Sequence, residues 1–217
     1  MCVRTGFSNS TYLTVNCYTP AMTPQMIAKQ LGETGLCVCP NFLNSANLTA
    51  TQADLTALRL SGEMHRAGTG QGREQQIQDQ VRRDDICWLD RAAANAVQAV
   101  LWQRLDLLQV AFNRTLFLGL HDFEGHYAVY PVGGFYRRHL DNFQQGGTRV
   151  VSLILYLNHE WKKMDGGELR VYEKDGSHTG IDPMGGTLVC FLSQESEHEV
   201  MPSFRTRSSF VGWYRRA

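Results

Sequence analysis

A histidine and an aspartate stand two residues apart at His139 and Asp141, at the end of a segment predicted to be a strand. Side chains at positions i and i+2 project from the same face of a strand, so an imidazole and a carboxylate can converge on one ion. A second histidine, His198, stands at the start of another predicted strand much later in the chain. We therefore expect these three side chains to bind one metal ion.

Two histidines and one carboxylate form the facial ligand set of non-haem Fe(II) sites, which leaves three coordination positions open. A 2-oxoacid can occupy two of those positions and dioxygen the third. Neither the His-x-Asp pair nor His198 is specific alone, because each such feature is more often a surface or packing element. The histidines without comparable partners are interpreted as surface or packing residues; they are His65, His121, His126, His159 and His178.

Arg207 adds a second kind of chemistry to this set. It begins the last predicted strand, in a largely apolar run. A guanidinium buried there needs an anionic partner, because an unpaired buried charge is very costly. Its planar fork matches a carboxylate at two points, and the distal carboxylate of 2-oxoglutarate is the natural candidate. Several weak signals thus agree on one site.

The second half of the chain supplies the strands that must position these residues. Short runs of strand-forming residues, punctuated by glycine pairs, predict eight strands. They cover residues 115–120, 126–130, 134–140, 149–157, 168–172, 187–192, 199–201 and 208–214. About eight short strands at this spacing indicate a sandwich or a barrel.

The first half of the chain predicts helices. Thr23 is a suitable N-cap for a helix that runs toward Gly35. A second helix is predicted to begin at Thr49, where a capping-box pattern occurs, and to end near Gly62. Residues 92–113 give the strongest helical periodicity in the chain.

The order of these elements predicts an α+β fold with a jelly-roll core backed by helices. We interpret residues 1–217 as one domain, in which 1–114 form a mainly helical support and 115–217 form the jelly-roll core. Residues 62–83 are polar and carry alternating glycines. A long polar loop in a compact domain is more often a mobile functional loop, and a short strand is expected after it at 86–88.

The composition excludes several partner classes. Lysine plus arginine equals aspartate plus glutamate, at 21 each, so the chain lacks the broad positive field of a nucleic-acid-binding protein. No apolar stretch approaches the length of a membrane span. The start of the chain is a poor signal peptide, and the six cysteines lack paired zinc spacing. We therefore expect reduced thiols and a cytoplasmic location.

From about Arg82 to Arg216 the sequence resembles the prolyl-hydroxylase branch of the 2-oxoglutarate oxygenases, especially the hypoxia-factor type and its bacterial relatives. The resemblance rests on RRDDICWL, YPVGGFYRRHLDN, RVVSLILYLNHEW, DGGELRVY, HEV and RTRSSFVGWY. It implies a double-stranded β-helix backed by helices, with Fe(II) held by His139, Asp141 and His198. It also implies 2-oxoglutarate and O2 as co-substrates, and it allows ascorbate as an additional cofactor.

The resemblance also implies roles in the oxoacid pocket. It selects Arg207, rather than the nearby Arg205, as the partner of the distal carboxylate. Tyr156 matches a tyrosine that donates a hydrogen bond to the same carboxylate, and Tyr130 matches a pocket tyrosine. Leu169 matches an apolar wall of the oxoacid site. Each of these three apolar or aromatic residues could instead serve ordinary core packing.

Residues around the polar loop also match the family. Tyr136 matches a second pocket tyrosine, with ordinary half-burial as the alternative. Arg82 and Asp84 resemble an Arg-x-Asp element that positions the loop over the substrate, and residues 62–83 correspond to that loop. Arg149 is expected to pair with Asp84, or to form a surface salt bridge of no functional weight.

The implied reaction converts 2-oxoglutarate and O2 into succinate and CO2 while a prolyl residue of a protein is hydroxylated. Bacterial relatives point to elongation factor Tu as the substrate, and animal relatives point to a transcription factor. The sequence does not choose between them, and it does not determine the oligomeric state.

Three alternatives stay open. The first is a 2-oxoglutarate oxygenase that acts on another side chain or on a small molecule, which would not need residues 62–83 to become ordered. The second is a metal-binding jelly-roll sensor without catalysis, although an oxoacid anchor at Arg207 and Tyr156 would then have no purpose. The third is a zinc hydrolase, for which no general base stands out.

Overall fold

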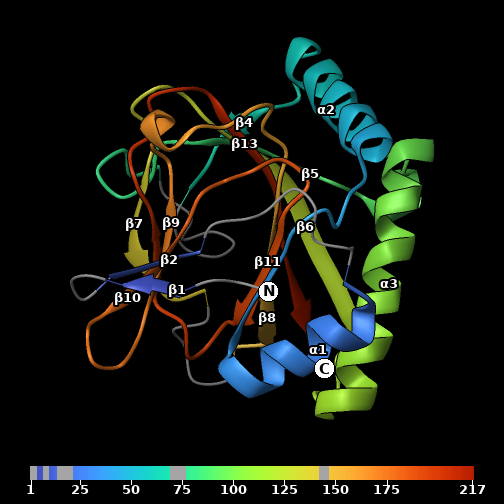
Figure 1. Ribbon diagram of the computed structural model, residues 1–217. Helices are drawn as coiled ribbons and strands as arrows, with labels where there is room; N and C mark the ends of the chain where they lie inside the picture. Colours follow the sequence, from blue (N-terminus) through green and yellow to red (C-terminus); the bar gives the residue numbers. More distant parts are fainter. Residues whose placement is uncertain (1–3, 7–9, 14–21, 69–76, 142–146) are drawn as a thin grey trace.

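Two β-sheets face each other, and three helices cover the outer face of the larger sheet (Figure 1). This architecture comes from a computed structural model, which describes residues 4–6, 10–13, 22–68, 77–141 and 147–217. Interior side chains from both sheets form one buried cluster, and a second cluster fills the space between the larger sheet and the helices.

The larger sheet has seven strands in the order β3 (Leu36–Cys39), β11 (Leu188–Leu192), β8 (Arg149–Tyr156), β13 (Arg207–Arg215), β6 (Asp122–Tyr130), β5 (Asp85–Trp88) and β4 (His65–Arg66). The smaller sheet has six strands in the order β1 (Arg4–Gly6), β2 (Ser10–Leu13), β10 (His178–Ile181), β9 (Leu169–Tyr172), β12 (His198–Val200) and β7 (Tyr136–His139).

From β6 onward the chain winds between the two sheets. Strands β6, β8, β11 and β13 belong to the larger sheet, whereas β7, β9, β10 and β12 belong to the smaller one. This winding is that of a double-stranded β-helix. The predicted α+β fold with a jelly-roll core and supporting helices is therefore confirmed.

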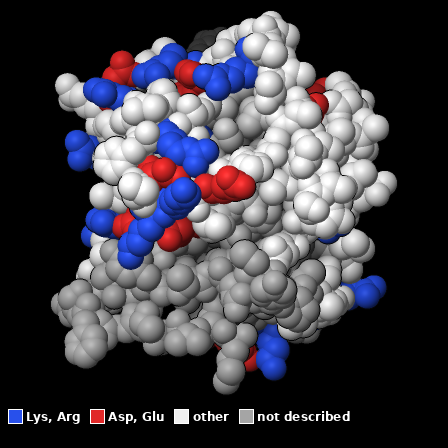
Figure 2. Space-filling model, turned by 45° about the horizontal axis from the view of Figure 1, so that its top comes forward, with Lys and Arg blue, Asp and Glu red and all other residues white. Residues whose placement is uncertain are grey.

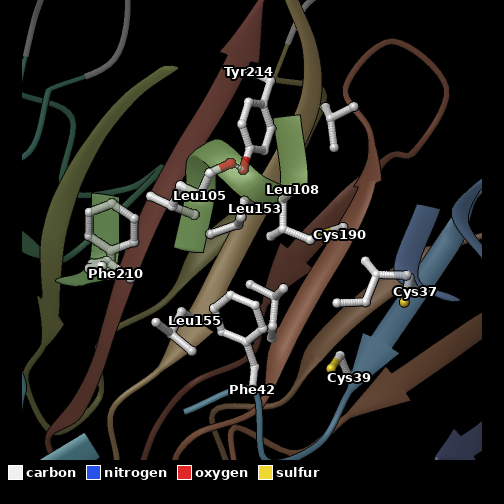
Figure 3. Close-up of a cluster of buried hydrophobic side chains, with 14 of the residues drawn as sticks. Cys37, Cys39, Phe42, Leu105, Leu108, Leu153, Leu155, Cys190, Phe210 and Tyr214 are labelled. Carbon is white, nitrogen blue, oxygen red and sulfur yellow. Dashed lines mark hydrogen bonds between the residues drawn. The ribbon is translucent and has the colours of Figure 1, made fainter. Parts of the chain in front are cut away.

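Strand β8 is buried on both faces, which explains its nearly continuous apolar sequence. Leu153 faces the helices, whereas Ile154 and Tyr156 face the interior between the sheets. Figure 3 shows the helix-side cluster, where the hydroxyl of Tyr214 donates to the carbonyl of Leu105 at 2.8 Å. Because side chains alternate along the strand, every second residue of β8 is available to build an interior site.

Helix α1 (Pro24–Thr34) lies between the caps that the sequence predicts. The hydroxyl of Thr23 accepts a hydrogen bond from the backbone N–H of Met26 at 3.2 Å, and Gly35 ends the helix in the left-handed conformation at φ 70°. Glycine reaches this conformation at little cost, so the predicted end of the helix is confirmed.

Helix α2 (Ser45–Leu60) begins four residues before the predicted start at Thr49, so that boundary was wrong. The side chain of Asn44 accepts a hydrogen bond from the N–H of Asn47 at 2.9 Å and caps the helix. Asparagine is as good an N-cap as threonine, and the capping-box pattern at Thr49 occurs inside a helix that had already begun.

Helix α3 (Ala96–Leu116) also differs from its predicted bounds at both ends. Residues Arg91–Ala93 form a separate 3-10 turn, and Asn95 and Gln98 make a reciprocal capping box at the true start. The predicted strand at 115–120 was wrong. The helix continues to Leu116, and the side-chain amide of Asn113 then binds both the N–H and the carbonyl of Leu120.

The other seven predicted strands are present with shifted ends, and so is the short strand predicted after the polar loop. The sequence analysis missed β1, β2, β4 and β10. Strand β10 contains Gly180 and polar residues, so its composition carried no strand signal. It pairs with β9 in the smaller sheet, where cross-strand contacts override weak local preference.

The polar segment 62–83 is attached to both sheets through its flanks. On one side, β4 pairs with β5 at the edge of the larger sheet. On the other, the N–H of Arg83 donates to the carbonyl of Phe135, and the N–H of Arg137 donates to Val81, beside β7 of the smaller sheet. Residues 69–76 lie outside the described part of the chain, so the mobility of this loop stays a prediction.

Charges of both signs are interspersed over one part of the surface in Figure 2, and many of the other described residues in this view are uncharged. Several ion pairs contribute to such mixing, including Arg138 with Glu197 and Arg170 with Glu168. None of the helices in the described part of the chain has the length and apolar character needed to cross a bilayer.

Candidate metal centre

Two neighbouring strands of the smaller sheet, β7 and β12, bring the predicted metal ligands together. His139 ends β7 and lies directly opposite His198 of β12, so their ring centroids are 4.2 Å apart. Asp141 follows β7, and its carboxylate oxygens lie 3.5 Å from Nε2 of His139 and 3.7 Å from Nε2 of His198. One potential ligand atom from each residue lies within 4.8 Å of the others, which suits a shared metal ion.

Backbone carbonyls orient both imidazoles. Nδ1 of His139 lies 2.7 Å from the carbonyl of Arg137, and Nδ1 of His198 lies 3.0 Å from the carbonyl of Ser196. A carbonyl only accepts, so each Nδ1 carries the proton. Each Nε2 therefore keeps the lone pair that a metal needs, and both Nε2 atoms face Asp141.

The electrostatic state of the cluster also suits a divalent cation. Burial, together with the neighbouring His139, lowers the pKa of His198 to about 4, so this imidazole is neutral at pH 7. Burial alone would raise the pKa of Asp141. The two histidines and the hydroxyl of Ser152 nevertheless hold that pKa well below its ordinary value, and the group stays ionised.

Arg207 occupies the other end of the same interior. Its side chain is 1% exposed, and its Nε donates to the carbonyl of Gly167 at 2.9 Å. Gly167 has a left-handed φ of 66°, and a Cβ added there would lie 3.0 Å from Cδ of Arg207. The glycine thus allows the backbone to approach the arginine closely. Nη2 of Arg207 has no hydrogen-bond partner among the described residues.

Two tyrosines flank this guanidinium. Its Cζ lies 5.0 Å from the ring centroid of Tyr130 and 5.1 Å from that of Tyr156. Burial raises the pKa of Tyr156 to about 12, so its hydroxyl stays protonated, although the positive charge of Arg207 opposes the shift. That hydroxyl is buried and likewise lacks a partner within the described chain. Nη2 of the buried guanidinium and the buried tyrosine hydroxyl are two donors without an acceptor, and such a pair fits a carboxylate ligand.

Leu169 lies in the same interior, in line with the apolar wall expected there. It is fully buried at the start of β9, directly opposite Val200 of β12 and Ile181 of β10. Two residues further along β9, Val171 lies opposite His198. Leu169 therefore stands one inward-facing position away from the metal ligands.

Arg82 connects the polar loop to the metal centre. Its guanidinium binds both oxygens of the buried Asp84 at 2.7 and 2.5 Å. It also lies 4.4 Å above the ring of Tyr136, which stacks on His139 with a centroid distance of 3.6 Å. The structure thus links Arg82, Asp84 and Tyr136 in one chain of contacts that ends at a predicted ligand.

The predicted pairing of Arg149 with Asp84 was wrong. Arg82 engages both carboxylate oxygens of Asp84, whereas Nε of Arg149 donates to Glu124 at 2.8 Å. Strands β8 and β6 both flank β13, so Arg149 reaches across that strand, and its guanidinium lies 3.6 Å above the ring of Trp213. Sequence spacing alone carries no information about this strand order.

An aromatic wall that the sequence analysis missed stands beside the loop; we define it as Trp88, His126 and Trp213. Trp88 is 50% exposed and meets the buried His126 edge-on at 4.8 Å. The ring of Trp213 lies 6.1 Å from Trp88, and its indole N–H has no partner in the described residues. Burial, with a contribution from the charge of Arg82, lowers the pKa of His126 to about 3. The tryptophans in WL and GWY were the available signal, but they also suit core packing.

Two buried serines were also missed. Ser152 of β8 donates to Oδ2 of Asp141 at 2.6 Å, and Ser193, just after β11, lies 2.9 Å from Ser152. A single serine at an inward-facing position of an otherwise apolar strand was the only sequence signal for this contact.

Comparisons with known proteins agree on one family. Residues 125–215 match the model of the 2OG-Fe(II) oxygenase superfamily. Over 205 residues the chain is 33% identical to a hypoxia-inducible factor prolyl hydroxylase of Caenorhabditis elegans; the match covers 87% of this chain and 27% of that protein. The chain thus spans about a quarter of the length of this relative.

Two solved structures are similar over nearly their whole length. A prolyl-4-hydroxylase of Pseudomonas putida has a TM-score of 0.82 and 38% identity, and the match covers 89% of this chain and 99% of that one. A prolyl hydroxylase of Trichoplax adhaerens, solved with a peptide fragment of the hypoxia inducible factor oxygen degradation domain, has a TM-score of 0.79 and 29% identity. That match covers 88% of each chain.

Proposed function

This chain belongs to the 2OG-Fe(II) oxygenase superfamily and, within it, to the prolyl hydroxylases, and we propose that it hydroxylates a prolyl residue in a protein substrate. When bound, the iron supplies the activation of O2 that couples decarboxylation of 2-oxoglutarate to oxidation of a C–H bond. One oxygen atom enters succinate, the other becomes the hydroxyl group, and CO2 leaves. The observation that carries this proposal is the presence of the His139, Asp141 and His198 cluster and an unsatisfied Arg207 in one interior.

His139, Asp141 and His198 would hold the Fe(II). The two imidazoles present Nε2 lone pairs because their Nδ1 atoms are committed to backbone carbonyls. Asp141 supplies the negative charge, and its low pKa keeps it ionised through the neutral range. A set of three protein ligands leaves positions open for the oxoacid and for dioxygen.

Arg207 and Tyr156 would bind the distal carboxylate of 2-oxoglutarate. Arg207 offers Nη2 and Tyr156 offers its hydroxyl, and both are buried without partners in the described chain. A carboxylate would satisfy both donors at once and neutralise the buried guanidinium. Tyr130 and Leu169 would complete the pocket with an aromatic ring and an apolar surface.

We call the part of the interior around Arg207 and Tyr156 the oxoacid end. It distinguishes the proposed oxygenase from the alternative functions. A structural metal site or a zinc hydrolase has no use for a buried arginine and tyrosine that lack an acceptor. The described cluster also contains no additional carboxylate or histidine beyond the three ligands, so a general base for hydrolysis does not stand out.

A peptide substrate is supported by the surroundings of the metal. Trp88 exposes half of its surface next to Trp213, whose strand partner is Ser152. An exposed aromatic ring is a common anchor for a protein partner. The polar segment 62–83 joins the edges of the two sheets through its flanks. Elongation factor Tu is the candidate from the bacterial side of the resemblance, and a transcription factor is the candidate from the animal side.

We also propose a reducing compartment, the cytoplasm, as the location. Cys39, Cys87 and Cys190 carry free thiols, and burial raises the pKa of Cys190 well above its ordinary value. Free thiols of this kind persist where the surroundings are reducing.

The first experiment is anaerobic reconstitution of the full chain with Fe(II) and 2-oxoglutarate. Wild type should develop the weak visible metal-to-ligand charge-transfer band of a chelated oxoacid. Arg207→Ala should need at least about 100-fold more oxoacid, because a buried ion pair broken on one side costs about 3–5 kcal/mol. Arg205→Ala is the matched control, since Arg205 is partly exposed and pairs with Asp165.

Absence of the band in wild type with iron shown to be bound would contradict oxoacid chelation at this centre. If the band forms, aerobic incubation with proline-containing peptides of elongation factor Tu and of a hypoxia-type transcription factor follows. The expected product is a peptide heavier by one oxygen atom on a proline. Oxygen on another residue would favour a related oxygenase with a different target side chain.

A further inference from the structure

Two buried hydroxyl groups form a chain that ends on the proposed carboxylate ligand. The hydroxyl of Ser152 lies 2.6 Å from Oδ2 of Asp141, and the hydroxyl of Ser193 lies 2.9 Å from that of Ser152. Ser152 is 1% exposed and Ser193 is fully buried. Water therefore has little access to these groups, and each must satisfy its hydrogen bonds within the protein.

The direction of the chain follows from counting protons. The hydroxyl of Ser152 donates its single proton to Oδ2 of Asp141. Ser152 then has no proton left for the second contact. Ser193 must be the donor between the two serines. The order is therefore Ser193 to Ser152 to Asp141, in which each bond polarises the next.

The sheet topology creates this chain. Ser152 of β8 lies directly opposite Phe191 of β11, and Ser193 is two residues further along on the same face. The N–H of Ser193 donates to the carbonyl of Val150 at 3.0 Å, which extends the ladder beyond the end of β11. Both hydroxyls thus face the interior at its metal end.

The same strand serves both ends of the interior. Side chains at 152, 154 and 156 of β8 alternate toward the interior. Tyr156 lies beside Arg207 at one end, and Ser152 binds Asp141 at the other. Strand β8 therefore sets the separation between the proposed oxoacid anchor and the proposed metal ligand.

We propose that Ser152, supported by Ser193, is a positioning residue that fixes the carboxylate of Asp141 for metal binding; this rests on the proposed function. Ser152 gives the carboxylate its one hydroxyl donor among the described residues, and it engages Oδ2. Oδ1 then remains for the cation, on the side of Nε2 of His139. Without this bond the carboxylate can rotate and offer both oxygens, which would take a coordination position that the co-substrates need.

The test is metal affinity, which is measured without turnover. Co(II) is titrated into the metal-free full chain, and the visible absorption of the bound ion reports binding. Ser152→Ala should weaken Co(II) binding by about 10- to 100-fold, the usual effect of losing a hydrogen-bond partner of a metal ligand. Ser193→Ala should weaken it by less than about 10-fold, because Ser152 still donates to Asp141.

Two further variants separate positioning from a packing defect. Ser152→Thr keeps the hydroxyl and should retain wild-type affinity within about threefold. Ser209→Ala removes a buried hydroxyl from β13 that has no partner in the described residues, so it should leave Co(II) affinity unchanged. Urea unfolding of each metal-free variant establishes that the protein compared is folded.

Equal Co(II) affinity of wild type and Ser152→Ala would overturn the positioning role. The role would also be overturned if Ser152→Thr bound Co(II) as weakly as Ser152→Ala, because the hydroxyl would then be irrelevant. Failure of the proposed function looks different. In that case wild type itself would bind metal without developing the charge-transfer band with 2-oxoglutarate, whatever the variants do.

Discussion

The interior between the sheets has two ends that differ in how their polar groups are satisfied. At the metal end, Nδ1 of His139 and of His198 and one oxygen of Asp141 already have hydrogen-bond partners. At the oxoacid end, Nη2 of Arg207 and the hydroxyl of Tyr156 have none within the described chain. The polar groups of the first end are paired within the protein, whereas the second end holds two buried donors that have no acceptor in the described residues.

This difference indicates how stability is distributed. Hydrogen-bonded ligands are held in place before the metal arrives, so little ordering remains for binding to accomplish. Buried donors without acceptors instead destabilise the ligand-free protein, each by about 1–3 kcal/mol. We expect ligand binding at the oxoacid end to raise the free energy of unfolding. Metal binding should change the order of the metal end little.

The largest effect is expected from the loss of a proposed metal ligand. His139→Ala removes one of three proposed ligands and should lower 2-oxoglutarate decarboxylation by more than about 100-fold, beyond the loss of a mere supporting hydrogen bond. Release of CO2 from carboxyl-labelled 2-oxoglutarate measures this. His159→Ala is the control, because His159 is exposed and lies outside the cluster. Unchanged turnover of 2-oxoglutarate in His139→Ala would contradict the assignment as an enzyme.

A pair of tyrosine variants sharpens the contrast at the oxoacid end. Tyr156→Phe should weaken 2-oxoglutarate binding by about 10-fold and leave the ligand-free protein at least as stable, because its hydroxyl has no partner to lose. Tyr127→Phe removes a hydroxyl that donates to Asp54 at 2.9 Å on the helix side. That variant should lose about 1 kcal/mol of folding stability and keep its oxoacid affinity.

Urea unfolding and titration of the charge-transfer band separate the two outcomes. The comparison between the two ends fails if Tyr156→Phe destabilises the ligand-free protein as much as Tyr127→Phe does. In that case the hydroxyl of Tyr156 would already be satisfied, and the oxoacid end would hold no reserve of donors.

Acidification should lower the folding stability through His126. Its pKa is lowered from 6.5 to about 3 by burial, followed by the charges of Arg82 and Arg149, while Asp141 opposes the shift. Between those pH values the unfolded chain binds a proton that the folded chain does not. Folding stability from the neutral imidazole is therefore complete above pH 6.5 and falls by up to about 1.4 kcal/mol per pH unit below it.

Unfolding free energies at pH 7 and pH 5 measure this effect. His126→Phe should lose less stability on acidification than wild type, whereas His121→Phe, at an exposed position, should behave like wild type. An identical loss in wild type and His126→Phe would show that acid acts elsewhere in the fold.

The smallest expected effect concerns the approach to the metal end. Trp88→Ala should raise KM for a protein substrate by about fivefold, since an exposed aromatic anchor contributes about 1 kcal/mol. The KM for 2-oxoglutarate should not change, because the oxoacid end lies elsewhere. Leu60→Ala is the control, as Leu60 is 84% exposed on α2 and makes none of the ring contacts of the aromatic wall. Equal changes in both KM values would mean that Trp88 supports the fold rather than the substrate.

The sequence alone predicted much of this site because its signals are local. The spacing of His139 and Asp141 predicted that both would face one ion, although Asp141 lies just beyond the end of β7. The cap residues Thr23 and Gly35 bound helix α1 as expected. The predicted start of α2 at Thr49 failed for an equally local reason. Two capping signals, Asn44 and Thr49, occurred close together in the sequence, and the chain used the earlier one.

Contacts between distant segments were beyond such reasoning. Ser193 meets Ser152 only because β11 is the neighbour of β8 in the sheet, and Arg149 meets Glu124 only because β13 separates β8 from β6. Strand order depends on the packing of the whole sheet and leaves no mark on residue spacing.

The amino-acid sequence by itself determined which chemical groups this protein carries and which face of a strand or helix each one occupies, because backbone periodicity is a local property. Only the tertiary structure decided which groups are satisfied and which are left without partners. Ser152 could have been an isolated hydroxyl, and Arg207 could have found a carboxylate of its own chain. Burial and hydrogen-bond pairing are collective properties of the packed sheets. They divide this interior into an end whose polar groups are paired and an end where Arg207 and Tyr156 keep buried donors unpaired within the described chain.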